Sequence, residues 1–498
     1  MTRLLLIAMA LVVGGCATFD EHLQSAPPQV RECAEWYAAL DAAVDEAGVR
    51  DAQYTRVSGF PYVRIDRLHA ALAGRAAASE ATLHAWVERL VELDIDARRH
   101  EIENLPRSSV DALPGLGRDY SRGFALKRTR DCARLLRQID LAKPQARAAL
   151  LERAHVPDDY SSASRLVGLY PLTRIAFAES IKRWQEETRA TFAAEPAAPP
   201  GANVVRYAPP ANAAPPRGAV AGLLARAQFD PLGFPSLSER EFERLVTAYA
   251  PSFEIVVTGD SDRFGLVRWR RGVEVPEVDA SDPAVYVHHS YTRYSGRLLL
   301  QLMYTIWFPE RAPATPNDIL AGRLDGLMWR VTLAPDGEPL VYDAIHPCGC
   351  YHEFFPTPRA HARPAPDPLE EWAFAPQSLP AIGEYERPVV RLASRTHYIE
   401  RVGIVRGADS LVRYNFYPYD TLRSLPDLQG GKRSIFGPDG IVAGTERTER
   451  FLYWPMGIAS AGAMRQWGRH ATAFVGRRHF DDADLLERRF ELDLGEHH

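Results

Sequence analysis

The sequence predicts a multidomain α+β protein with an N-terminal helical bundle, a proline-rich linker and a β-rich C-terminal domain that contains an antiparallel sheet. Three observations support this fold class. The chain has 498 residues, which exceeds one ordinary domain of roughly 150 residues. Apolar residues recur at helical spacing up to about residue 192 and at strand spacing beyond residue 220. Between these regions, residues 193–219 are rich in proline and alanine.

The composition is that of a globular protein. Hydrophobic residues make up 46% of the chain and charged residues 25%, which excludes a disordered or fibrous class. The formal net charge of -5 gives no basic bias, so nucleic acid is not an expected partner.

The N-terminus predicts export. Arg3 precedes ten apolar residues (4–13), too few to span a bilayer, and Cys16 follows two glycines. Residues 11–16 resemble the lipobox of bacterial lipoproteins, which implies a signal peptide over residues 1–16 and a lipid on Cys16. Ala17 favours the outer membrane, facing the periplasm, and residues 17–28 form a polar tether. The alternative is an ordinary secretory signal with a coincidental cysteine.

Helical periodicity covers residues 29–192. One apolar stripe closes near Gly48, a second helix starts after the N-cap Ser79, and a third ends before Pro144. Further helices are expected over residues 145–154 and 173–191.

Five cysteines call for a pairing scheme. With Cys16 lipidated, an oxidising compartment favours two bridges. Cys33 and Cys132 each lie on an apolar helical stripe, so we expect a disulfide that joins two helices. The alternative is two buried, unpaired thiols.

The prolines of residues 193–219 predict an extended spacer with too little apolar mass to bury. We therefore expect the boundary between the two domains in this segment.

Residues 220–498 are expected to be rich in strands. The strongest prediction is a hairpin of residues 326–333 and 339–345 around Asp336-Gly337, because Asp-Gly favours tight hairpin turns. Residues 298–308 form an apolar run typical of a buried central strand. Residues 451–454 are expected to form a short strand, and residues 459–467 and 483–491 short helices.

The hairpin's second strand runs into the densest group of reactive side chains in the chain: His346, Cys348, Cys350, His352 and Glu353. In an extended strand the first four share a face, but the two histidines would lie about 20 Å apart. One tetrahedral metal ion cannot bridge that span. A bend at residues 347–349 would let two or three of them meet a ligand from elsewhere, and His288 and His289 are the expected donors.

Three interpretations of this segment stay open. Thiolate and imidazole ligands suit zinc or copper. Cys348 and Cys350 could instead form a small, strained disulfide. In the third interpretation, these are ordinary buried polar residues at the end of a strand.

Residues 286–294 form a second group, with His288 and His289 among tyrosines and Ser290, as in a polar ligand pocket. The alternative is an aromatic strand with half-exposed histidines. No Gly-x-Ser-x-Gly motif supports a serine nucleophile.

The candidate carboxylates are Asp325, Asp343, Glu353 and Glu400. Glu353 and Asp343 are the candidates for a general base or for a group that orients a ligating histidine. His397, His470 and His479 are isolated in the sequence and are expected to be structural.

The sequence thus predicts a membrane-anchored, periplasm-facing lipoprotein whose C-terminal domain binds an envelope partner or a small ligand. The alternative is a periplasmic metal-dependent hydrolase or oxidoreductase that uses the His/Cys cluster. Beyond the lipobox, the sequence resembles no family that would decide between them.

Overall fold

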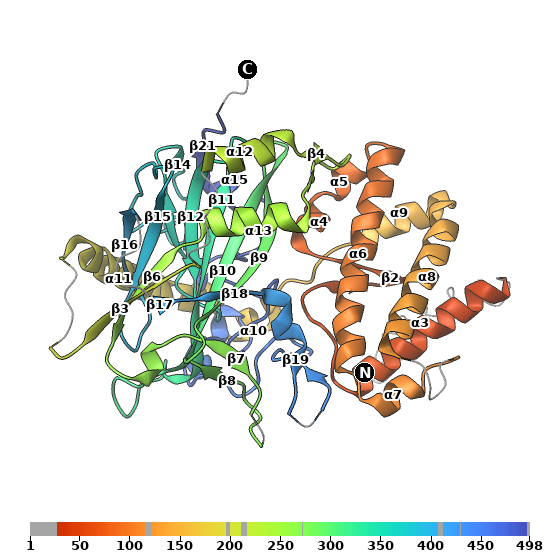
Figure 1. Cartoon of the computed structure of the whole chain (residues 1–498), viewed down its shortest axis with the longest axis horizontal. Helices are drawn as coiled ribbons and strands as arrows, with labels where there is room; N and C mark the ends of the chain where they lie inside the picture. Colours follow the sequence, from red (N-terminus) through yellow and green to blue (C-terminus); the bar gives the residue numbers. More distant parts are fainter. Residues whose placement is uncertain are drawn as a thin grey trace, which may run out of the picture. The chain divides into compact units, whose positions relative to one another are not determined.

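The computed structural model describes residues 27–115, 121–195, 200–210, 217–270, 272–406, 412–428 and 430–495. The expected signal peptide with Cys16 and nearly all of the expected tether lie outside these residues. The chain divides into two compact units, residues 1–156 and 157–498 (Figure 1). Within the described residues, every helix is too short or too polar to cross a bilayer.

The first unit is largely helical, as predicted. Its long helices are α3 (Pro28–Glu46), α6 (Glu80–Asn104), α8 (Arg122–Leu141) and α9 (Pro144–Arg153). Ser79 caps α6 as expected, because its side chain accepts a hydrogen bond from the Thr82 N–H. The shorter helices are α4 (Arg67–Ala71), α5 (Ala73–Ala76) and α7 (Arg107–Asp111). A hairpin of β1 (Thr55–Val57) and β2 (Phe60–Ile65), which the sequence analysis missed, packs against α6.

The expected disulfide between Cys33 and Cys132 is confirmed. It joins α3 to α8 with a Cα–Cα distance of 5.1 Å. Both cysteines are buried, and Trp36 beside them donates a hydrogen bond to the Thr129 hydroxyl. The bridge therefore ties together two helices that already share a core.

The second unit is built on a six-stranded sheet in the order β13-β12-β11-β10-β9-β18 (Figure 1). The strands are β9 (Ala284–Tyr294), β10 (Arg297–Arg311), β11 (Gly322–Leu333), β12 (Pro339–Ile345), β13 (Glu353–Pro356) and β18 (Asn415–Pro418). All neighbours are antiparallel except β18 and β9. The predicted hairpin is β11 and β12, and the predicted central strand is β10.

A five-stranded sheet faces the first, in the order β16-β15-β6-β3-β17. It contains β3 (Asn203–Ala208), β6 (Ser252–Val257), β15 (Glu386–Leu392), β16 (Ile399–Arg406) and β17 (Val412–Arg413). The largest apolar core lies between the two sheets, where Phe253 and Ile255 of one meet Tyr304 and Trp329 of the other. A second core, with Met303 and Trp467, covers the opposite face of the six-stranded sheet.

The remaining elements of this unit surround the sheets. Its helices are α10 (Ser162–Val167), α11 (Tyr170–Ala193), α12 (Arg217–Arg226), α13 (Glu239–Tyr249), α14 (Arg450–Tyr453) and α15 (Leu485–Arg489), with 3-10 turns η1 (Asp260–Asp262), η2 (Tyr419–Arg423) and η3 (Trp454–Met456). Its short strands are β4 (Gln228–Phe229), β5 (Pro235–Ser236), β7 (Leu266–Arg268), β8 (Glu277–Asp279), β14 (Ala360–Ala362), β19 (Leu425–Pro426), β20 (Lys432–Arg433) and β21 (Phe490–Leu492).

The division of the chain differs from the expected boundary at residues 193–219. The expected spacer contains β3, which pairs with β6 and buries Val205 and Tyr207. Helix α11, expected in the N-terminal domain, belongs to the second unit because Trp184 packs against Phe374 and Phe192 against Phe355. Alternating apolar side chains in β3 outweighed the local proline content.

Three local expectations are corrected in the C-terminal region. Residues 451–454 were expected to be a strand, but Arg450–Tyr453 is a short helix. Residues 459–467 form turns instead of a helix, and the expected helix over 483–491 is shortened to Leu485–Arg489 because Phe490–Leu492 pairs with β14. In each case tertiary pairing or burial overrides a short local pattern.

Candidate functional site

The segment that follows β12 bends sharply at residues 347–349, as the sequence analysis required for any joint site. The Gly349 N–H donates to the His346 carbonyl at 2.8 Å, and the His346 N–H donates to the Cys350 carbonyl at 3.0 Å. Gly349 (φ +88°) and Tyr351 (φ +60°) both have left-handed backbone conformations. The bend separates His346 and His352 and directs each to a different carboxylate.

His346 is held by Asp325 of β11. The distance between His346 Nδ1 and Asp325 Oδ1 is 3.2 Å, and both side chains are buried. Burial lowers the pKa of His346, which keeps the imidazole neutral. With Nδ1 bonded to Asp325, Nε2 is the nitrogen left to face a ligand.

Asp325 is the centre of a buried ionic cluster. His397 Nδ1 lies 2.8 Å from Asp325 Oδ2, and the Arg447 guanidinium donates to Oδ1 at 3.3 Å. Although burial opposes ionisation, His346 and Arg447 lower the pKa of Asp325. His397 Nε2 also lies 3.6 Å from Asp262, and the two carboxylates raise the pKa of His397 against the effect of burial. The ring of His397 stacks on Phe308 at 3.8 Å. His397, which is isolated in the sequence and was expected to be structural, belongs to this cluster.

His352 and Asp343 form a separate cluster. His352 Nε2 lies 2.9 Å from Asp343 Oδ2, and Asp343 also accepts two hydrogen bonds from Arg330. Arg330 in turn donates to the Phe480 carbonyl. Burial lowers the pKa of His352 to about 3. Arg330 and His352 thus both bind the buried Asp343 carboxylate, whose role as a general base or as a group that orients a histidine stays a prediction.

His288 and His289 are adjacent on β9 and therefore point to opposite faces of the sheet. His288 packs between Tyr419 and Trp467, and His289 contacts Phe242. The register puts His288 opposite Met303 of β10, Met303 opposite Arg330, and Arg330 opposite Asp343. Three strand spacings, about 14 Å, separate the backbones at His288 and Asp343. The sheet does not bring the His288-His289 pair to the turn at residues 346–352.

Cys348 and Cys350 are unbridged. In the described part of the chain, none of the six sequence candidates for metal binding (His288, His289, His346, Cys348, Cys350 and His352) belongs to a group of three mutually close ligand atoms. Ser290, expected to belong to a polar pocket, donates its hydroxyl to the Gln301 side chain at 3.0 Å.

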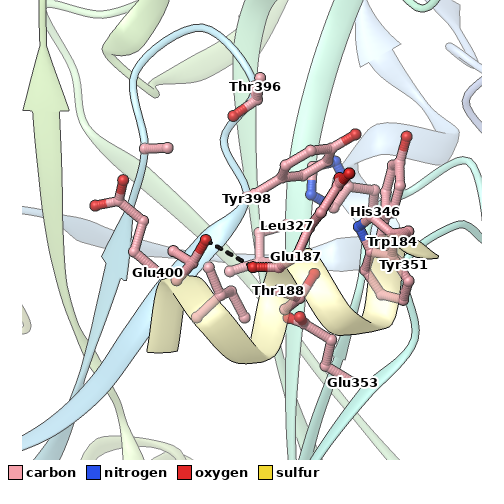
Figure 2. Close-up of a pocket in the computed structure, with 13 residues that line it drawn as sticks. Trp184, Glu187, Thr188, Leu327, His346, Tyr351, Glu353, Thr396, Tyr398 and Glu400 are labelled. Carbon is pink, nitrogen blue, oxygen red and sulfur yellow. Dashed lines mark hydrogen bonds between the residues drawn. The ribbon is translucent and has the colours of Figure 1, made fainter. Parts of the chain in front are cut away.

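A cavity of about 220 Å³ opens where α11 lies against the ends of β12, β13 and β16. Figure 2 shows Trp184 and Glu187 on the helix, Tyr398 and Glu400 around the start of β16, and His346 and Tyr351 beside Trp184. We call this cavity the His346 pocket. Its lining comprises Trp184, Glu187, Thr188, Thr191, Leu327, His346, Tyr351, Glu353, Ala393, Thr396, Tyr398, Ile399 and Glu400.

Glu353 is the most unusual side chain of the pocket. It is only 5% exposed, and no hydrogen bond or ion pair to its carboxyl group is found within the described ranges. Burial raises its pKa well above the usual range. A buried carboxyl group without a partner is costly for a fold to keep, and such groups cluster at functional sites.

Aromatic rings form the rest of the wall. Tyr351 and Tyr398 are in edge contact at 4.5 Å between centroids, and both contact the His346 ring. Trp184 packs on Tyr351 at 5.5 Å. Behind the wall, the Arg311 guanidinium covers Tyr398 at 4.8 Å from its ring. These packed rings hold the polar groups of the pocket in place.

Sequence reasoning found His346, Glu353 and Glu400 of this pocket but missed Trp184, Glu187 and Tyr398. The first two lie on a helix assigned to the other domain, and no local motif marks Tyr398. Asp325 was named, but only the pairing of β10 with β11 and the bend after β12 reveal its link to His346 and His397.

Comparisons with protein-family models, curated proteins and solved structures find no match to this chain.

Proposed function

We propose that this protein is an exported lipoprotein whose second unit binds a small polar ligand in the His346 pocket. The lipobox-like residues 11–16 support lipidation of Cys16 and attachment to the outer membrane, facing the periplasm. The Cys33–Cys132 disulfide supports an oxidising compartment. Labelling with radioactive palmitate tests the anchor: the proposal requires label on the wild-type chain and none on Cys16→Ser.

The observation that carries the ligand proposal is the unpartnered carboxyl group of Glu353 in the cavity wall. A hydrogen-bond donor on a ligand would supply the partner that the protein does not provide. The lining includes the carboxyl groups of Glu187, Glu353 and Glu400 but no lysine or arginine. A neutral or cationic ligand with donor groups fits this lining better than an anion.

The aromatic side chains of the pocket give a second criterion for the ligand. Trp184 and Tyr351 offer aromatic surface next to the polar groups, which suits a ligand with an apolar face as well as donor groups. A volume of about 220 Å³ limits the enclosed part of the ligand to a small group.

A second candidate function is acid–base catalysis on such a ligand. Asp325 binds His346 through Nδ1, so Nε2 would be the nitrogen that accepts a proton, while burial raises the pKa of Glu353 and favours its protonated form as a donor. Environments that push the pKa values of two groups apart assign an acid and a base. In this version water would lose a proton to His346 while Glu353 protonates the leaving group. The geometry favours this over the metal-dependent hydrolase or oxidoreductase, because the candidate zinc or copper ligands are dispersed.

A fragment screen by ligand-observed NMR tests the proposal. Wild type should bind donor-bearing fragments, and Glu353→Gln and Trp184→Ala should weaken them at least about tenfold, which corresponds to about 1.4 kcal/mol. Glu491→Gln, an exposed glutamate on β21, serves as the control. Hits that bind all four proteins equally would show that the pocket is not the binding site.

A further inference from the structure

The turn between β12 and β13 places two thiols side by side. The Cys350 N–H donates to Cys348 Sγ at 3.4 Å, so the backbone of one cysteine directly contacts the sulfur of the other. Gly349 lies between them, and there is no space for a side chain at this position. A Cβ there would lie 2.6 Å from the Ala471 carbonyl oxygen. The fold therefore fixes the backbone that brings the thiols together.

The two thiols differ in access. Cys348 is buried with 3% of its surface exposed, whereas Cys350 is only partly buried. A small cavity of about 20 Å³ adjoins the turn and is lined by both cysteines, Gly349 and the segment 471–474. A reagent would thus reach Cys350 first, and Cys348 would react from inside.

The surrounding chain indicates oxidising conditions. The Cys33–Cys132 bridge belongs to a class of disulfides that is rare in reducing compartments. Two free thiols on one tight turn are then placed to respond to the same conditions.

We propose that Cys348 and Cys350 form a redox-active dithiol that exchanges with the disulfide of a small thiol compound. The Cys350 sulfur attacks one sulfur of the disulfide, forms a mixed disulfide and releases the first thiol, which takes up the Cys350 proton. The Cys348 sulfur then attacks the Cys350 sulfur, closes the Cys348–Cys350 bond and releases the second thiol with the Cys348 proton. Two protein thiols are oxidised and one disulfide is reduced to two thiols.

The neighbouring Cys348, together with burial, raises the pKa of the Cys350 thiol. Since the thiolate is the attacking species, the first step is slower than for an exposed cysteine at neutral pH. Once the mixed disulfide forms, the adjacent Cys348 makes the second step intramolecular.

The exchange would also act on the His346 pocket. The Cys350 carbonyl accepts the His346 N–H, and Tyr351, the next residue, lines the pocket in a left-handed conformation. Closing an S–S bond of about 2.05 Å draws together two sulfurs that are not bonded in the reduced form. The turn must adjust, and both pocket residues are attached to it.

The test uses the full chain, incubated with cystine, then alkylated with iodoacetamide and digested with trypsin. Both cysteines fall in one peptide, residues 331–359, which holds no other cysteine. We expect this peptide to lose two hydrogens and to escape alkylation, and dithiothreitol to reverse the change. Hydrogen exchange of the amides at residues 346–352 should differ between the two forms.

Single variants separate the steps. Cys348→Ser should accumulate the Cys350–cysteine mixed disulfide, and Cys350→Ser should accumulate little, because its remaining thiol is buried. Three results in the wild-type protein would overturn the proposal: both thiols stay alkylatable after cystine, a mixed disulfide persists without ring closure, or a stoichiometric metal ion protects the thiols. Each is read on wild type, so misfolding of a variant does not obscure the answer.

Discussion

At the scale of single residues, the pocket depends on two carboxyl groups that the fold treats in opposite ways. Asp325 is surrounded by cationic and hydrogen-bonding partners, which lower its pKa, whereas Glu353 is buried without a partner, which raises its pKa. Removing the Asp325 carboxyl group should therefore destabilise the fold. The Glu353 carboxyl group destabilises the fold while it is present. This contrast distinguishes a supporting residue from one that is kept for binding or chemistry.

Glu353→Gln should stabilise the protein at pH 8. The folded-state pKa of Glu353 lies above its unfolded value, so unfolding releases its proton at high pH and the native state loses stability as pH rises. The glutamine amide of the variant cannot ionise. Thermal unfolding should show a higher Tm for the variant at pH 8, by roughly 2–4 °C for each kcal/mol gained, and little difference at pH 4. A lower Tm at pH 8 would mean that the carboxylate has a favourable native partner.

Asp325→Asn should destabilise the second unit by about 3–5 kcal/mol, because it leaves the buried cations Arg447 and His397 without their shared counter-charge. Glu400→Gln is the matched control in the same pocket. Its ion pair with Arg391 is partly exposed, so the loss should be about 1 kcal/mol or less. Urea unfolding measures both, and equal losses would contradict the assigned role of the Asp325 cluster.

At the scale of elements, the decisive feature is the bend that ends β12. The sequence predicted the β11–β12 hairpin from Asp336-Gly337, and it identified residues 347–349 as the place where a bend was needed. Strand periodicity does not predict the direction in which the side chains point after the bend. That outcome depends on Asp325 and Asp343, which lie on opposite faces of neighbouring strands.

Gly349→Ala tests this bend. An alanine would adopt φ near +88° and place its Cβ 2.6 Å from the Ala471 oxygen, whereas Gly296 (φ +77°) has open space around it. Gly296→Ala should therefore cost only the backbone strain of about 1–2 kcal/mol. Gly349→Ala should cost more, because of the added collision. Chemical denaturation of both variants makes the comparison, and a smaller loss for Gly349→Ala would argue against the described turn.

At the scale of the whole molecule, the proline content of one segment led to a predicted domain boundary that differs from the division seen in the structure. The prolines of residues 193–219 indicated a spacer, yet Val205 and Tyr207 alternate within them and complete a sheet. Helices and the Cys33–Cys132 bridge were predictable because their signals are local or limited to few partners. The pocket was only partly predictable, since it joins α11, β12, β13 and the start of β16, which lie up to about 200 residues apart.

Tyr207→Ala tests the revised division. Tyr207 is 2% exposed in the core between the sheets, so its truncation should cost about 3–5 kcal/mol. Val204→Ala, at a side chain 39% exposed on the same strand, should change stability by about 0.5 kcal/mol. If urea unfolding of the second unit is unaffected by Tyr207→Ala, the segment is a spacer after all.

The proposed ligand pocket depends on Glu353 as an unpartnered acid, and a measurement of its pKa tests this. In protein labelled with ¹³C at the glutamate carboxyl carbon, the Glu353 signal can be assigned by its loss in Glu353→Gln and followed against pH. The structure predicts a midpoint well above 4.5, the ordinary value for glutamate. A midpoint at or below 4.5 would show that the carboxyl group is solvated or paired, and would contradict the claim.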